Sequence, residues 1–535
     1  MAAGFTGERQ FTWCSFFISL VISSGVLSFG YPTAILGTTF SQPSFLAYMG
    51  LVNGDGITTS RVQALIGATS GVYQGGAVVG ILISIWVMDK FGRKACFVYA
   101  AILGVIGAVG DCAAQNMAMF IVFRFFAGAG AWSSLCISPV YISELAPPKL
   151  RGLFVGLTGV ILMLGQAIAS YMGLAFFSIQ NGSSIQWRGP LGIQAIFPLI
   201  SLVVAKWLPE SPRWCLMNDQ VERARNIVTG LHGKDEAAQD FALAEFYQMH
   251  KQAEFDRTLD ASWWKCLRTP SYRRRFEMCC IYGFITQSTG LLVISAYGSA
   301  LYGSLGYGAR EQILFQCGYL TAAVVFNILG DLIVDAVGRK RLMLIGFVSC
   351  TIWMILETAM VAEFASPVPE NPNKAGLAMA VAALYLYIAF YAPTIDTAGF
   401  VYYTEVFPNH LRAKGVSLAI FFSALADVAY LQAASTAFAN IGWKFFLIFI
   451  IIPVIGTIYI ALRFPETRGL PLEEVAMLFG DEDQVMVFSE DIQINHDSHK
   501  LRIRDRRGHD GTTDASDDSA KRSRLAAEQI EVAYT

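Results

Sequence analysis

The sequence predicts an all-α membrane protein with twelve transmembrane helices in two pseudo-symmetric six-helix bundles. Three observations support this fold class. Of the 535 residues, 54% are hydrophobic and only 15% are charged, whereas a soluble protein usually carries about a quarter charged residues. Twelve apolar runs are long enough to cross a bilayer. A charged turn between two such runs is repeated in the second half of the chain.

Helices are the expected element because each satisfies its backbone hydrogen bonds within one segment, as the water-free core of a bilayer requires. A spanning helix needs about 20 mostly apolar residues. More spans follow the first one, so we interpret it as a retained helix and not as a cleaved signal peptide. The predicted spans lie near residues 12–35, 62–88, 95–114, 118–142, 153–178, 190–208, 277–302, 313–334, 342–363, 376–404, 414–437 and 443–463.

Lysine and arginine residues are divided unequally between the two sets of short loops. Ten lie in the loops that follow even-numbered spans, and five lie in the opposite loops. Because basic loops remain in the cytoplasm, the sequence predicts the first set and both termini on the cytoplasmic face of a membrane, which we expect to be the plasma membrane. A sequon in an outer loop makes Asn181 a candidate glycosylation site.

The spans divide the chain into five segments. The polar stretch between the bundles predicts short amphipathic helices, and the charge-rich end of the chain cannot bury enough apolar surface to fold. The segments are a cytoplasmic N-terminus (1–11), the first bundle (12–208), a cytoplasmic linker with short helices (209–275), the second bundle (276–464) and a cytoplasmic, largely disordered tail (465–535).

Three pairs of motifs occur in the same order in both halves of the chain. The turn Asp89–Lys94 (Asp-Lys-Phe-Gly-Arg-Lys) recurs as Asp335–Lys340 (Asp-Ala-Val-Gly-Arg-Lys) with equal internal spacing. The offsets between the halves are 246, 261 and 256 residues (339−93, 412−151 and 465−209), so we infer two homologous six-helix halves. The other two pairs are Glu144–Arg151 with Glu405–Arg412, and Pro209–Arg213 with Pro465–Gly469.

With these motifs the chain resembles the sugar porter branch of the major facilitator superfamily, in a fungal-like form, over about residues 12–475. Arg124 with Gly128 and Gly130, and the run Pro139–Glu144, belong to the same set of signatures. The resemblance implies the major facilitator fold. In that fold two six-helix bundles flank a solute site near the bilayer midplane and open it alternately to each side.

The repeated charged residues are candidates for a latch on the cytoplasmic side. Ion pairs among them would hold that side closed, and partly hydrated pairs of small net energy would break in each cycle. The alternative is that these charges only obey the topology rule for basic loops. The candidates are Asp89, Arg93, Glu144 and Arg151 in the first half, and Asp335, Arg339, Glu405 and Arg412 in the second.

Several positions at which the family carries sugar ligands are altered here. A sugar site needs hydrogen-bonding groups to replace water around the hydroxyls, and an aromatic face for the ring. The residues that remain as candidate ligands are Gln166, Gln287, Tyr297 and Phe400. We therefore expect weaker binding of an ordinary hexose, or a different solute. The altered positions are Thr286 for Gln, Leu292 for Asn, Gly159 for Gln, Phe400 for Trp, and Ser423-Ala424 for a polar–aromatic pair.

Proton coupling is also in question. Proton-coupled relatives carry an Asp where this chain has Pro32, so Arg124 is expected to lack a titratable partner, which favours a facilitator. The rival interpretation uses Asp396 and Asp427, which lie near mid-membrane by count, where charged residues are functional candidates. A role in interhelical hydrogen bonding is the alternative for both.

Three more residues bear on this question. Asn327 and Asp331 share one face of the eighth span at i, i+4 spacing, and Asn327 joins Asp396 among the candidate substrate ligands. Asp331 is expected to form a structural ion pair near the cytoplasmic end. Pro393, three residues before Asp396, is expected to break the tenth helix and free carbonyl groups.

The leading functional hypothesis is a transporter of a sugar or related polyhydroxylated solute that works by alternating access. The alternatives are a transporter or exporter of a less polar metabolite, and a sugar sensor that does not transport. We expect no enzymatic activity, because no glycine-rich phosphate loop precedes a Lys-Ser/Thr pair. The six histidines form no metal-ligand cluster, so no metal or cofactor is expected, and a net charge of −2 gives no indication of nucleic-acid binding. The lipid bilayer, the solute and protons are the expected partners.

Overall fold

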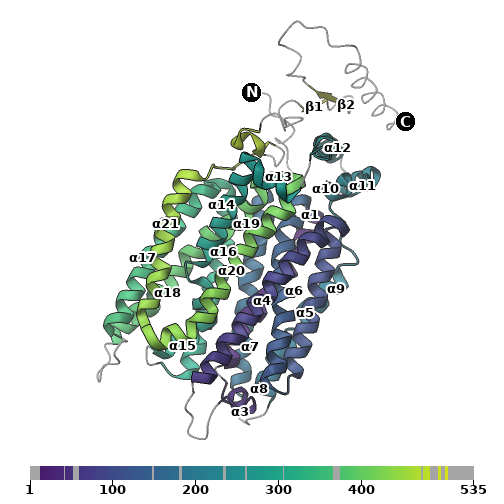
Figure 1. The fold of residues 1–535 in the computed structure, drawn as a ribbon. Coiled ribbons are helices and arrows are strands. Elements are labelled where there is room, and N and C mark those ends of the chain that lie inside the picture. Colours follow the sequence, from purple (N-terminus) through teal and green to yellow (C-terminus); the bar gives the residue numbers. More distant parts are fainter. Residues whose placement is uncertain are drawn as a thin grey trace.

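The protein folds into two helical bundles that lie side by side (Figure 1). Twelve helical segments of the described chain are long and apolar enough to cross a membrane, and each overlaps a predicted span, so the predicted fold class is confirmed. The computed structural model describes residues 12–40, 42–51, 60–147, 150–179, 184–232, 236–259, 262–304, 307–364, 374–470, 474–481, 492–495 and 500–503.

The first bundle contains six spans, of which the first and sixth are each divided into two helices. The division in the first span falls at Gly25 and Val26. The helices are α1 (Trp13–Ser24), α2 (Leu27–Phe40), α3 (Pro43–Tyr48), α4 (Ser60–Phe91), α5 (Arg93–Ala113), α6 (Met117–Leu145), α7 (Arg151–Phe177), α8 (Ile185–Ile193) and α9 (Ile196–Val204).

The second bundle also contains six spans, of which two are interrupted: the seventh and the tenth span of the chain. Gly290, at φ +89°, separates α14 from α15. A π-helix at Pro393 separates α18 from α19. The elements are α14 (Pro270–Gln287), α15 (Leu291–Ser304), α16 (Ala309–Val337), α17 (Arg339–Phe364), α18 (Lys374–Tyr391), the π-helix η3 (Ala392–Asp396), α19 (Thr397–Val406), α20 (Asn409–Ile441), the 3₁₀ helix η4 (Gly442–Leu447) and α21 (Ile448–Arg463).

The linker and the described part of the tail lie together at one end of the bundles, which we call the linker end (Figure 1). The predicted tail contains a 3₁₀ helix and a short antiparallel hairpin, and the hairpin is the one departure from an all-α chain among the described residues. The linker helices are α10 (Pro212–Met217), α11 (Val221–His232), α12 (Glu236–Asp256) and α13 (Trp263–Arg268), and the tail elements are η5 (Val475–Phe479), β1 (Ile492–Asn495) and β2 (Lys500–Ile503).

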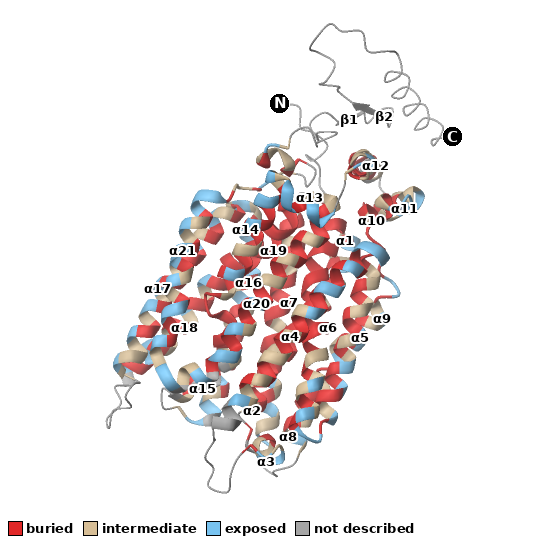
Figure 2. Cartoon of the chain, in the orientation of Figure 1, coloured by how far each residue is buried: buried red, intermediate tan, exposed pale blue. Residues whose placement is uncertain are grey.

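Burial follows the arrangement of the helices (Figure 2). The two bundles meet along two helix pairs, α4 with α20 and α7 with α16. Residues on these inner faces are buried, whereas apolar side chains such as Leu82, Val122 and Leu332 are exposed on the outer faces. An exposed apolar belt suits a lipid solvent, because lipid tails are as apolar as leucine.

The two repeated turns have the same backbone geometry. Gly92 and Gly338 have φ of +96° and +102°, with ψ of 176° and 156°. Such backbone conformations are essentially limited to glycine. A Cβ atom at Gly92 would also lie 2.6 Å from Oε2 of Glu210, and one at Gly338 would lie 2.7 Å from Oε2 of Glu466. The glycine in each repeat is therefore required by the turn and by the carboxylate packed against it.

We predict that Gly92→Ala lowers the thermal midpoint of the detergent-purified protein, because strain of this kind costs on the order of 1–3 kcal/mol. Gly75→Ala is the matched control, since a Cβ there meets no atom within 4 Å and alanine favours a helix by about 1 kcal/mol over glycine. Equal midpoints for G92A and the parent protein would contradict the geometry of the turn.

Candidate functional site

Each bundle contains one arginine–glutamate pair at its linker end. Arg93, the first residue of α5, donates from Nε and Nη2 to Glu144 on α6 at 2.9 and 2.8 Å. Arg339, the first residue of α17, donates in the same way to Glu405 on α19 at 3.1 and 2.8 Å. Such two-point pairs fix geometry as well as adding energy. The sequence repeat is therefore also a repeat of side-chain contacts.

A second carboxylate in each bundle receives the backbone N–H groups at the start of the arginine helix. Glu210 accepts from the backbone of Arg93 at 2.9 Å, and Glu466 accepts from the backbone of Arg339 at 2.9 Å. Helix N-termini favour negative charge. Both glutamates lie in repeated motifs of the sequence, from which no role was predicted for them. Each glutamate directly follows a proline at the end of a six-helix half, and this repeated position could have predicted a shared role.

The expectation that these pairs are partly hydrated is wrong. The side chains of Arg93 and Glu144 are 6% and 1% exposed, and those of Arg339 and Glu405 are 4% exposed each. The linker and the chain after α21 each contact one pair: Arg213 donates to the Glu144 carbonyl at 3.2 Å, and Thr467 Oγ1 donates to Glu405 Oε2 at 2.6 Å. Breaking one buried pair is strongly unfavourable. Because both partners belong to one bundle, the pairs can stay intact when the bundles move apart.

The contacts between the bundles at the linker end are longer or more exposed. Lys414 Nζ lies 3.6 Å from Asp89, and Arg412 Nη1 lies 3.9 Å from Glu144. Asp335 accepts from the backbone N–H of Leu153 at 3.2 Å, across the interface and in the first turn of α7. These three contacts cross from one bundle to the other at the linker end, where the latch was predicted.

Arg151 completes the set of predicted latch residues. It is the first residue of α7 and it is 1% exposed. The eight residues therefore make two kinds of contact. The arginine–glutamate pairs lie within one bundle, whereas other contacts of Asp89, Asp335 and Arg412 cross between the bundles, and Asp335 also pairs with Arg339 of its own bundle at 2.8 Å.

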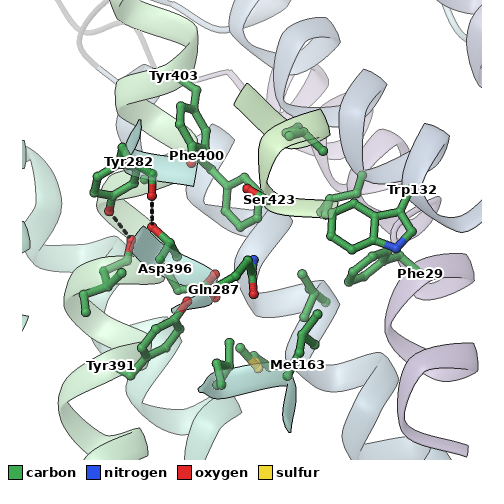
Figure 3. A pocket seen from close by; sticks show the side chains of 18 of the residues that line it. Phe29, Trp132, Met163, Tyr282, Gln287, Tyr391, Asp396, Phe400, Tyr403 and Ser423 are labelled. Carbon is green, nitrogen blue, oxygen red and sulfur yellow. Dashed lines mark hydrogen bonds between the residues drawn. The ribbon is translucent and has the colours of Figure 1, made fainter. Parts of the chain in front are cut away.

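A cavity lies between the bundles (Figure 3). Both bundles contribute to its wall, with α2, α6 and α7 on one side and α14, α15, α18, η3, α19 and α20 on the other. The lining residues are Phe29, Trp132, Leu135, Leu162, Met163, Gln166, Tyr282, Thr286, Gln287, Leu291, Leu292, Tyr391, Ile395, Asp396, Gly399, Phe400, Tyr403, Ile420 and Ser423.

Most of the predicted ligands lie in this wall. Gln166, Gln287, Phe400 and Asp396 line the cavity, whereas Asn327 lies behind Asp396. Two predictions fall outside what the structure describes: the side chain of Tyr297 and the candidate glycosylation site Asn181.

Two amide oxygens in the wall have no hydrogen-bond partner among the described residues. They are Oε1 of Gln166 and Oε1 of Gln287. The Gln166 amide nitrogen donates weakly to Thr33 at 3.4 Å. A buried acceptor left unsatisfied costs about 1–3 kcal/mol. Hydroxyl groups of a bound solute would satisfy both oxygens.

Aromatic rings make up much of the rest of the wall, and the sequence analysis missed most of them. Phe29 and Trp132 pack edge to face with centroids 5.0 Å apart on the first-bundle side. Tyr282, Tyr391 and Tyr403 face them from the second bundle (Figure 3). A tryptophan among small residues, as in the run Gly128–Trp132, was a usable signal. The tyrosines lie on helices that are apolar on every face, so the sequence gave no signal that they line a cavity.

Asp396 is held by a short chain of hydrogen bonds at the break in the tenth span. Asn327 Nδ2 donates to Asp396 Oδ2 at 2.7 Å, and Thr397 donates to Asn327 Oδ1 at 3.0 Å. The interruption predicted at Pro393 takes the form of a π-helical turn inside a span that stays helical from Ala375 to Val406, and side chains bind carbonyl groups there. Tyr282 donates to the Ile395 carbonyl at 2.9 Å. π-Helical turns of this kind occur mostly at functional sites.

Gly159 explains how a carboxylate and an amide fit between the bundles. A Cβ atom at Gly159 would lie 3.0 Å from Oδ1 of Asn327 and 3.1 Å from Oδ2 of Asp396. A larger side chain at position 159 would therefore compete for the space that Asn327 and Asp396 occupy.

The expectation that Arg124 lacks a titratable partner is wrong. Asp111 on α5 lies 3.3 Å from Arg124 on α6, and both side chains are fully buried. The Pro32 carbonyl accepts a second bond from Arg124 at 3.1 Å. Gly107 lets α5 and α6 pack closely enough to bring the pair together. An acid inside the apolar run 95–114 was the signal that was overlooked.

The other membrane acids are placed differently from Asp396. Asp427 on α20 is 0% exposed, does not line the cavity, and has no partner for either carboxyl oxygen in the described part of the chain. The structural ion pair expected for Asp331 is not found there either, since both of its oxygens also lack partners. Glu357 on α17 is a further buried acid that the sequence analysis did not consider.

Comparisons with known proteins agree with this architecture. The family described as "Sugar (and other) transporter" matches residues 18–479. Two relatives are each 28% identical: the MFS-type transporter criB of Aspergillus cristatus, covering 88% of this chain and 95% of the relative, and a high-affinity glucose transporter of Kluyveromyces lactis, covering 85% and 83%. The solved structure of the proton:xylose symporter XylE of E. coli, bound to 6-bromo-6-deoxy-D-glucose, is 24% identical with a TM-score of 0.75, covering 87% of this chain and 99% of that one.

We predict that Asp335→Asn opens the linker end more often. It removes a negative charge that faces the start of α7, worth roughly 0.3–1 kcal/mol, or about a two- to fivefold change in the open-to-closed ratio. The measurement is maleimide labelling, from the linker end, of a cysteine placed at Ser423 after replacement of the ten native cysteines.

The matched control is Asp219→Asn. Asp219 pairs with Arg257 within the linker, and asparagine tolerates its positive φ of +59°. Labelling of D335N at the rate of the parent and of D219N would show that Asp335 does not contribute to the latch.

Proposed function

The chain belongs to the sugar (and other) transporter family, and from that premise we propose that it carries a sugar or a related polyhydroxylated solute across a membrane by alternating access. The observation that carries the proposal is the cavity between the bundles. It combines unsatisfied amide oxygens with aromatic faces and is separated from the linker end by the latch.

Solute recognition is proposed to divide between the two halves. Gln166 from the first bundle and Gln287 from the second would accept hydrogen bonds from solute hydroxyls, and Trp132 and Phe400 would pack on the apolar faces of the ring. Leu292 makes the wall less polar at a position where the family carries an asparagine. This composition favours a solute that forms fewer hydrogen bonds with amide groups than an ordinary hexose does.

The motion that we propose follows from the two kinds of contact at the linker end. The bundles would rock about the cavity as rigid bodies, each with its buried arginine–glutamate pair intact. The contacts of Asp89, Asp335 and Arg412 across the interface would break and re-form in each cycle. Weak, partly exposed charge contacts suit this role because each contributes little free energy to the closed state.

We further propose that the protein lies in the plasma membrane with its linker end in the cytoplasm, and that it catalyses no reaction. The distribution of basic residues supports the orientation. Membership of a transporter family supports the absence of catalysis.

The direct test is uptake of labelled glucose, xylose and myo-inositol by the purified protein in liposomes, measured as counterflow against a preloaded solute. Saturable counterflow of at least one of them supports the proposal. Counterflow of none of them, together with labelling of the cavity unaffected by any of them, would contradict it and favour a less polar cargo or a sensor.

We predict that Gln287→Ala raises the KM for the transported solute about two- to tenfold with little change in kcat, because one hydrogen bond is worth roughly 0.5–1.5 kcal/mol. Gln220→Ala is the matched control, since this glutamine lies on the linker and pairs with Arg223. An unchanged KM in Q287A would remove Gln287 from the binding site.

A further inference from the structure

A row of glycines faces a row of polar side chains across the interface between the bundles. On α7, Cβ atoms at Gly152 and Gly156 would collide with the carboxyl groups of Asp335 and Asp331 on α16. Residues four apart share one face of a helix. The two rows therefore run side by side, from Asp335 at the linker end toward the cavity.

The row ends at the cavity. One turn beyond Asp331 on α16, Asn327 lies opposite Gly159 and donates to Asp396, which lines the cavity. Along this line the small residues of the first bundle leave space that only the acids and amide of the second bundle occupy. The interface thus holds a continuous series of polar groups between the solute cavity and the linker end.

No cation faces Asp396 in the described part of the chain. The ionisable side chains near enough to act on it are Asp331 on α16, Tyr282 on α14 and Tyr391 on α18, and its hydrogen bond comes from the neutral amide of Asn327. A buried carboxylate with no positive partner is costly as an ion but not as a neutral acid. The Arg124–Asp111 pair differs, because its opposite charges balance.

Asp331 supplies an independent second observation. It is 4% exposed, both of its carboxyl oxygens lack hydrogen-bond partners among the described residues, and they point at the backbone of Gly156 on the opposite bundle. An unpartnered buried acid between Asp396 and Asp335 is unexplained by packing alone. It is explained if this interface admits water or a proton when the bundles separate.

We propose that Asp396 is the proton-binding site that couples a proton gradient to solute transport in this protein, and that Asp331 lies on the path of the proton to the linker end. The inference rests on the proposed function. It places the coupling acid in the second bundle, where the sequence has Asp396, and not in the first, where it has Pro32.

The proton balance is simple. With the cavity open to the side opposite the linker end, the Asp396 carboxylate takes one proton from water and forms an O–H bond at Oδ1, since Oδ2 accepts from Asn327. The neutral acid allows the interface with α7 to close around it. When the linker end opens, the O–H bond breaks, the proton passes to water beside Asp331, and the carboxylate re-forms. One proton moves with each solute, and no other bond changes.

The test uses the full-length protein in liposomes that contain a pH-sensitive dye, with a solute found by counterflow. A pH difference of one unit should drive about tenfold accumulation for one proton per solute, and solute entry should acidify the interior. Asp396→Asn should lose both the accumulation and the acidification while counterflow remains measurable. Asp396→Glu, which keeps a carboxyl group, should recover part of the accumulation.

Asp427→Asn is the matched control, since Asp427 is as buried and unpartnered but does not line the cavity. It should accumulate solute like the parent.

Counterflow without accumulation in the parent would overturn the inference and leave the proposed function standing. Loss of coupling in D427N but not in D396N would also overturn it. Absence of counterflow for every solute in the parent would remove the proposed function and this inference with it. If D396N elutes as an aggregate on gel filtration, D396E decides: a D396E protein that accumulates no solute overturns the inference.

Discussion

A buried charge is costly unless a partner balances it, and this constraint shapes the linker end of both bundles. It fixes Arg93 on Glu144 and Arg339 on Glu405, each through two hydrogen bonds. It also fixes Glu210 and Glu466 at the starts of α5 and α17, where backbone N–H groups would otherwise be unsatisfied. The charged turns repeated in the sequence contain the two arginines of these contacts, whose glutamate partners lie in other segments.

The same constraint distinguishes contacts within a bundle from contacts between the bundles, as the proposed rocking motion needs. The strongest pairs join helices of one bundle, so they stabilise each bundle as a unit. The contacts that cross the interface are single and longer, such as Arg412 with Glu144 at 3.9 Å. A rocking motion has only to break the second kind. Buried pairs that had to separate in each cycle would oppose the motion that the family requires.

The interface between α7 and α16 shows how a small residue in one bundle admits polar groups from the other. Gly159 leaves the space that Asn327 and Asp396 fill. Arg124 has a buried acid beside it, Asp111, which comes from another helix of its own bundle. The π-helix at Pro393 places Asp396 in the cavity wall, where Tyr282 binds the Ile395 carbonyl.

The sequence by itself determined the number of spans, the two-fold repeat, the glycine turns and the break at Pro393, because these depend on length, composition and local backbone chemistry. It also identified Gln166, Gln287, Phe400 and Asp396 as residues that the structure places in one cavity. Only the tertiary structure decided the partners across helices: Asp111 for Arg124, Asn327 for Asp396, and the aromatic wall around Trp132. A helix that is apolar all round carries no periodic signal of which face meets which neighbour. Pairing and burial between such helices therefore become known only when the helices are packed.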